Sequence, residues 1–206
     1  MERLAEFALL ALIVELTPGP NMAYLATLGI AHGRRAGFTA VLGVATGLLV
    51  YGVLTALGFS ALIETIPGAY EALRWGGSLY MLWLAVEAWR GEGPAPDRAP
   101  RAPPGDRTLL WRGFAINVLN PKAAIFYLAI LPQFADPASD HLLAQTLALV
   151  AIYVAVATVV HLTIVAASSA LAPWFTPGGT RELAVRRALA VALALIAIWM
   201  FLSTRR

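Results

Sequence analysis

The chain has 206 residues, of which 59% are hydrophobic and 13% are charged, with a formal net charge of +3. An average soluble domain has about 25% charged residues, so this composition excludes an ordinary water-soluble globular protein. The absence of cysteine excludes disulfide scaffolds, thiolate metal sites and thiol redox chemistry.

Six stretches of the chain are long and apolar enough to cross a membrane as helices, which takes about 20 mostly apolar residues. We place them at residues 4–30, 36–60, 70–90, 111–134, 142–172 and 183–203. The sequence therefore predicts an all-α membrane protein with six transmembrane helices, in a single membrane domain of residues 1–206.

The arginines between the spans indicate how the chain is oriented. Loops 31–37, 90–112 and 173–187 together hold ten of the fourteen arginines. Loops rich in Arg and Lys stay on the cytoplasmic side, which places both termini outside. The excess of basic residues is thus explained by the orientation of the chain in the membrane, and we expect no nucleic-acid partner.

A linker rich in proline, glycine and arginine divides the chain at residues 91–108. It separates a first half, residues 1–90, from a second half, residues 109–206, with three spans each. Because three is odd, the second half begins on the opposite side of the membrane from the first. The sequence therefore predicts two three-helix halves related as an inverted repeat.

The first and fourth spans are each interrupted by polar residues and proline. The first contains the run Thr17-Pro18-Gly19-Pro20-Asn21, and the fourth contains Asn120-Pro121-Lys122. Proline removes an amide donor and clashes with the preceding turn, so both helices should break. We expect the first helix to restart at Asn21 and the second at Pro121, with Asn120 as its N-cap.

Lys122 is the only lysine of the chain and lies deep in an apolar span. A charge inside the membrane costs a few kcal/mol, which a bound carboxylate would offset. The alternative is a side chain that extends to the membrane surface. The residues that we expect to bind substrate are Pro18, Gly19, Pro20, Asn21, Asn117, Asn120, Pro121 and Lys122.

These motifs resemble the LysE/RhtB family of bacterial amino-acid exporters. The resemblance is carried by Leu16-Thr17-Pro18-Gly19-Pro20-Asn21, by Gly33-Arg34-Arg35-Ala36-Gly37 with Gly43 and Gly47, by Gly113-Phe114, by Asn120-Pro121-Lys122-Ala123 with Phe126, and by Leu131-Pro132-Gln133-Phe134. It implies a multi-pass exporter in the bacterial inner (plasma) membrane, driven by protons and acting on homoserine, threonine, lysine or leucine. Exporters of basic amino acids in this family carry an acidic residue in the second span. The corresponding stretch, residues 47–52, has none, which favours a neutral substrate.

Two ionisable residues within the spans are candidates for proton coupling, Glu15 and His161. Glu15, just before the first break, is interpreted as a proton carrier, as a partner of Lys122 or of the substrate ammonium, or as a member of a structural ion pair. His161 is interpreted as a proton relay or as an imidazole bonded to a backbone carbonyl. The sequence does not decide between these roles.

Gly43 and Gly47 form a face of small residues that favours close helix packing, either within the chain or in a homodimer. The leading interpretation is a proton-driven exporter of a neutral amino acid, with substrate, protons and lipid as its partners. The alternatives are an exporter of a basic amino acid, of another small metabolite or of a cation, and a structural membrane protein. We expect no enzymatic activity, cofactor or metal, since no catalytic or metal-ligating cluster is evident.

Overall fold

The computed structural model describes residues 2–17, 19–58, 104–136 and 138–171, and single positions within 75–89 and 184–198. Every element in this described part is helical, which confirms the predicted all-α class. The predicted spans 70–90 and 183–203 fall mostly outside the described residues, although their described positions are helical.

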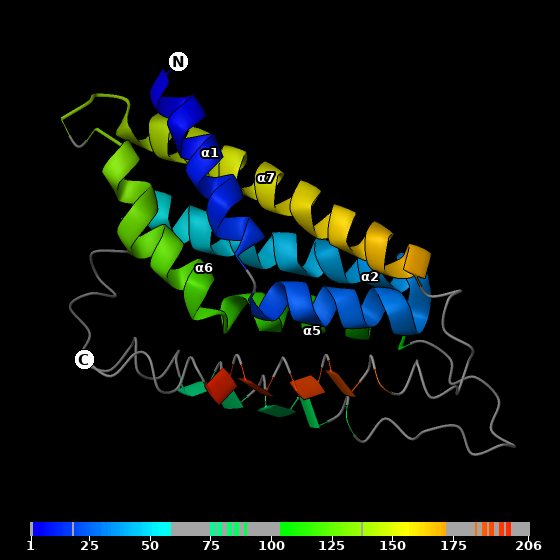
Figure 1. The fold of residues 1–206 in the computed structure, drawn as a ribbon. Helices are drawn as coiled ribbons and strands as arrows, with labels where there is room; N and C mark the ends of the chain where they lie inside the picture. Colours follow the sequence, from blue (N-terminus) through cyan, green and yellow to red (C-terminus); the bar gives the residue numbers. More distant parts are fainter. Residues whose placement is uncertain are drawn as a thin grey trace, which may run out of the picture.

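The first two predicted spans appear as helix α1 (Glu2–Leu16) and helix α2 (Pro20–Ala56), which is bent in its interior. The bend lies at Gly33, whose φ of 76° is readily adopted by glycine but not by other residues. There the chain reverses its direction (Figure 1). The boundary predicted between residues 30 and 36 therefore falls at a glycine turn and not at an extended loop.

The fourth predicted span is a series of helical pieces. They are helix α5 (Asp106–Val118), helix α6 (Pro121–Ile125), the π-helical turn η1 (Phe126–Ile130) and the 3₁₀ turn η2 (Leu131–Phe134). Helix α5 begins five residues before the expected residue 111 and within the expected linker 91–108. Asp106 in its first turn explains the early start, because a carboxylate stabilises the positive end of a helix.

Helix α7 (Leu142–Leu171) matches the predicted span 142–172 to within one residue. Of the described helices, α2 and α7 are each long and apolar enough to cross a membrane. A third candidate span is the bent pair Asp106–Val118 and Lys122–Phe134, whose parts meet at 55°.

Glycines on α2 bring its backbone close to the neighbouring helices. A Cβ added at Gly43 would collide with the backbone oxygen of Leu110 on α5, and one at Gly113 would collide with that of Ala40. A Cβ added at Gly52 would collide with the side chain of Val150 on α7. The Gly43 and Gly47 face thus packs on α5 of the same chain, which answers the question that the sequence left open between an internal and a second-protomer partner.

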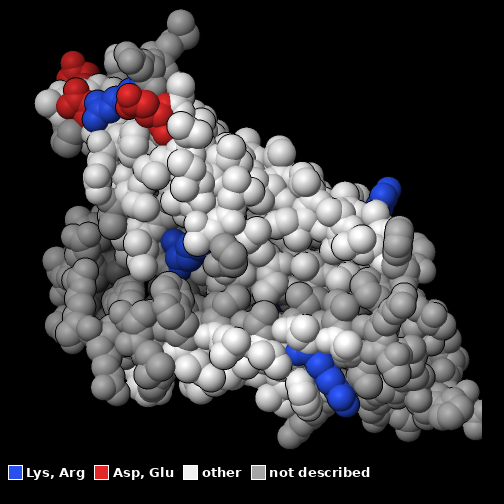
Figure 2. Space-filling view, viewed as in Figure 1, with Lys and Arg blue, Asp and Glu red and all other residues white. Residues whose placement is uncertain are grey.

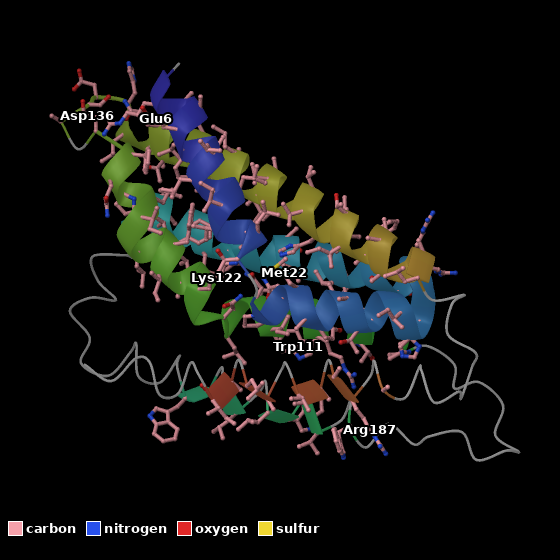
Figure 3. The ribbon with its side chains drawn as sticks, viewed as in Figure 1. Glu6, Met22, Trp111, Lys122, Asp136 and Arg187 are labelled. Atoms are coloured by element: carbon pink, nitrogen blue, oxygen red, sulfur yellow. The ribbon has the colours of Figure 1, made fainter. Side chains whose placement is uncertain are left out.

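The described charges lie mostly at the ends of the helices. Glu6 and Asp136 lie at the same end of the molecule (Figure 3), where Arg3 also donates a hydrogen bond to the Gln133 carbonyl at 3.0 Å. The visible face carries few charges between the ends (Figure 2); one basic patch lies at the position that Figure 3 labels Lys122, and another lies lower on the same face. This distribution suits helices that cross an apolar layer.

Candidate functional site

The first break separates α1 from α2. Helix α1 ends at Leu16, and α2 begins at Pro20, one residue earlier than expected. Gly19 precedes α2 in an extended conformation, and no side chain caps the helix there. Proline has no amide hydrogen, so Pro20 cannot donate to the carbonyl four residues before it. The break therefore leaves carbonyl groups at the end of α1 without partners inside the helix.

The second break separates α5 from α6 and is built differently. As predicted, Asn120 caps α6, because its side chain accepts a hydrogen bond from the Lys122 amide at 3.0 Å. At the end of α5, the hydroxyl of Tyr51 on α2 donates to the Val118 carbonyl at 2.6 Å. Polar groups on both sides of this break thus have partners within the protein.

Lys122 connects the two breaks. Its ammonium donates a hydrogen bond to the Thr17 carbonyl at 2.9 Å, across 105 residues of sequence. Its side chain passes Gly19, where an added Cβ would lie 3.5 Å from the lysine Cδ. Figure 3 shows Lys122 at mid-length of the helices, near Met22 at the start of α2. The lysine therefore binds within the protein, beside the break.

A pair of buried amides also joins the two broken spans. Asn21 donates from Nδ2 to Oδ1 of Asn117 at 2.9 Å, and both side chains are buried. Gly47 on α2 makes room for this pair, since a Cβ there would lie only 2.8 Å from Nδ2 of Asn117. Oδ1 of Asn21 is buried without a hydrogen-bond partner. Nδ2 of Asn117 is likewise buried without a partner, so the pair leaves one acceptor and one donor unsatisfied within the protein.

Glu15 lies just before the first break and is 4% exposed. The Tyr153 hydroxyl donates to its Oε1 at 2.7 Å, and Nε2 of His161 lies 3.3 Å from its Oε2. Both partners lie on α7, eight residues apart and thus on similar sides of that helix. Of the two roles considered for His161, the bond to a backbone carbonyl is not formed, since both ring nitrogens are buried without a hydrogen-bond partner. The imidazole instead faces the Glu15 carboxylate, at a distance within ion-pair range.

These groups surround a small cavity. Its lining includes Glu15, Gly19, Asn21, Asn120, Lys122 and His161. Its volume is about 10 Å³, close to the space that one water molecule needs. An amino acid is larger than this space, so the cavity must widen to admit one.

The structure thus brings together most of the residues predicted for the site. Two described ones are exceptions: Pro20 and Asn117 are outside the cavity lining, although Asn117 binds Asn21. Pro18 lies outside the described residues, as does the side chain of Pro121. In the described ranges, no three acidic or histidine side chains form a metal-binding group.

Sequence reasoning missed three residues of the site: Thr17 as a carbonyl acceptor, Tyr51 and Tyr153. A signal existed for Tyr153, since it lies two helical turns before His161 in the same apolar span. No comparable signal existed for Tyr51, because its partner Val118 is 67 residues away.

A half-buried cation and a buried carboxylate beside two broken membrane helices are typical of secondary transporters. A family model described as LysE type translocator matches residues 12–204. The chain belongs to this family. No solved structure matches it.

Several relatives carry names that describe an efflux activity. The homoserine/homoserine lactone efflux protein of Salmonella typhimurium is 33% identical over 137 residues, 66% of each chain. The leucine efflux protein of Enterobacter sp. (strain 638) is 33% identical over 152 residues, 68% of this chain and 70% of the relative. The threonine efflux protein of Salmonella typhi is 26% identical over 132 residues, 62% and 64% of the two chains. The matched regions thus span about two thirds of these relatives.

Proposed function

We propose that this chain is a secondary transporter that exports a neutral amino acid of the homoserine, threonine or leucine type from the cytoplasm. The family and the names of its relatives support amino-acid efflux. The observation that carries the proposal is the Lys122 ammonium, held beside a buried carboxylate where the two breaks meet. A zwitterion has the complementary pair of charges.

The proposed architecture has six transmembrane helices in two halves, residues 1–90 and 109–206, which form an inverted repeat in the bacterial plasma membrane. The matching breaks after α1 and α5 support this repeat. The distribution of arginines supports an orientation with both termini outside. One half would move against the other to expose the cavity to each side in turn.

In the proposed mechanism, the substrate carboxylate binds the Lys122 ammonium, and the substrate ammonium binds carbonyl groups freed by the first break. Lys122 is suited to this role because its backbone is fixed by the Asn120 cap while its side chain remains half-buried at the cavity. Opening must accompany binding, since the closed cavity has room for about one water molecule.

Proton antiport is proposed to use Glu15 and His161. The two side chains lie 3.3 Å apart and are both buried, so a single proton can be shared between them. Tyr153 keeps the carboxylate in place by donating to its other oxygen. Because Glu15 belongs to α1 and His161 to α7, protonation can change how these two helices hold together.

The test is efflux from preloaded proteoliposomes, with homoserine, threonine, leucine and lysine compared in parallel. We expect export of at least one neutral amino acid, and loss of about 100-fold or more in Lys122→Ala, because the carboxylate loses its charged partner. Arg35→Ala is the matched control, since Arg35 is an exposed cation that pairs with Asp106 at the surface. Normal export by a well-inserted Lys122→Ala protein would refute the role of Lys122.

A further inference from the structure

An ammonium group is already bound at the first break. In an unbroken helix, the Thr17 carbonyl would accept a hydrogen bond from the amide of residue 21. Here α2 restarts at Pro20, and the Thr17 carbonyl instead accepts from the Lys122 ammonium at 2.9 Å. The chemistry of this position thus suits a primary ammonium.

Further acceptors line the same cavity. Glu15 places a carboxylate there, 4% exposed, and Asn21 has a buried Oδ1 without a partner. An ammonium has three donors, of which the Thr17 carbonyl takes one. The surroundings therefore offer a small cation more acceptors than the Thr17 carbonyl alone.

Lys122 also lines the cavity while it bonds to the first break. The cavity of about 10 Å³ holds about one water molecule while the lysine bonds to Thr17. A substrate can enter only after this bond breaks. Breaking it leaves two groups without partners, a free ammonium on one span and a free carbonyl on the other.

We propose that the Thr17 carbonyl, with Glu15 and Asn21, is the binding subsite for the primary α-ammonium of the substrate, and that Lys122 closes this subsite when substrate is absent. The inference rests on the proposed function and deepens it. A zwitterion replaces each interaction that it breaks, because its carboxylate binds the released lysine and its ammonium takes the place of the lysine at Thr17. A ligand without a carboxylate displaces Lys122 without giving it a partner.

The decisive variant is Lys122→Met, which keeps an unbranched side chain and removes the ammonium. Binding of L-leucine and L-leucinol would be measured on purified protein in lipid nanodiscs; leucinol keeps the ammonium but has no carboxylate. We expect Lys122→Met to bind leucinol about tenfold more tightly than the wild type. In the variant, leucinol no longer has to break the charge-assisted hydrogen bond between Lys122 and Thr17, and one such bond accounts for a change of this size. Leucine binding should weaken in the same variant.

A role of Lys122 in carboxylate binding alone does not predict this tighter binding of leucinol. If Lys122 serves only to bind the carboxylate, its removal leaves leucinol binding unchanged. Unchanged or weaker leucinol binding by Lys122→Met would therefore overturn the proposed closure. Arg35→Met is the matched control, with unchanged affinity for both ligands expected.

A second measurement needs no ligand. The chain has no cysteine, so Met22→Cys adds a single thiol at the cavity lining. We expect a water-soluble maleimide to label it about tenfold faster when Lys122→Met is also present, whereas equal rates would contradict closure by Lys122. This comparison remains informative even if the wild type exports none of the amino acids tested, an outcome that would refute the proposed function itself.

Discussion

The two helix breaks interrupt corresponding spans but differ in how their polar groups are satisfied. At the second break, Asn120 caps the new helix and Tyr51 binds the Val118 carbonyl. At the first break, Gly19 provides no side-chain cap, and the Thr17 carbonyl depends on the ammonium of Lys122. The second break is thus held by groups fixed in the protein, and the first by a side chain that can leave. This difference suits a division of roles, in which the second break positions Lys122 and the first break binds ligand.

Glu15→Gln should have the largest effect in this comparison, because only the first break has a buried carboxylate beside it among the described residues. We expect the acceleration of export by an inward proton gradient to fall by about tenfold or more. The reason is that a glutamine side chain does not take up or release a proton near neutral pH. Export would be measured in proteoliposomes with and without the gradient.

Glu6→Gln is the matched control for this prediction, because Glu6 lies on the same helix but is exposed. It should retain the full response to the gradient. If Glu15→Gln also retained it, the carboxylate would have no part in the proton path, and the contrast between the breaks would be limited to Lys122.

Tyr51→Phe should weaken the second break by leaving the Val118 carbonyl without its donor. A buried acceptor without a partner costs about 1–3 kcal/mol, so the melting temperature of the detergent-solubilised protein should fall by several degrees. Tyr127→Phe is a matched control, since the Tyr127 hydroxyl is buried without a hydrogen-bond partner and its removal should cost little. Equal losses in the two variants would mean that the Tyr51 bond is unimportant.

Asn120→Ala tests the cap at the second break. Loss of a side-chain N-cap costs about 1 kcal/mol, and we expect a correspondingly lower melting temperature. Asn120→Ser should recover most of this loss, because serine also caps helices. A stability unaffected by alanine would show that the bond from the Lys122 amide is not needed to restart α6.

Gly19→Asn should have the smallest effect, because it gives the first break the cap that the second already has. Gly19 is extended, with φ of −162°, and a Cβ there would make ordinary contact with Lys122 at 3.5 Å. Since glycine is itself a tolerated N-cap, we expect a gain of a few tenths of a kcal/mol in the same melting assay. A large loss would show that the position tolerates no side chain.

Much of the fold followed from patterns within single spans. The prolines predicted both breaks, the Asn120 cap was predicted from its own tripeptide, and α7 matched its apolar stretch within a residue. The start of α5 was missed because hydropathy does not detect a polar first turn such as the one at Asp106. The loop predicted between residues 31 and 37 is only a turn at Gly33, whose positive φ reverses the chain within very few residues.

The sequence by itself determined where the helices break and that the single lysine lies at one of these breaks. These features depend on the missing amide hydrogen of proline and on the length of apolar runs, which act over a few neighbouring residues. Only the tertiary structure decided that Lys122 binds Thr17, that Tyr153 and His161 hold Glu15, and that Tyr51 satisfies Val118. Each of these partners is at least 67 residues away in the chain, so the pairing depends on how helices pack side by side and not on local sequence.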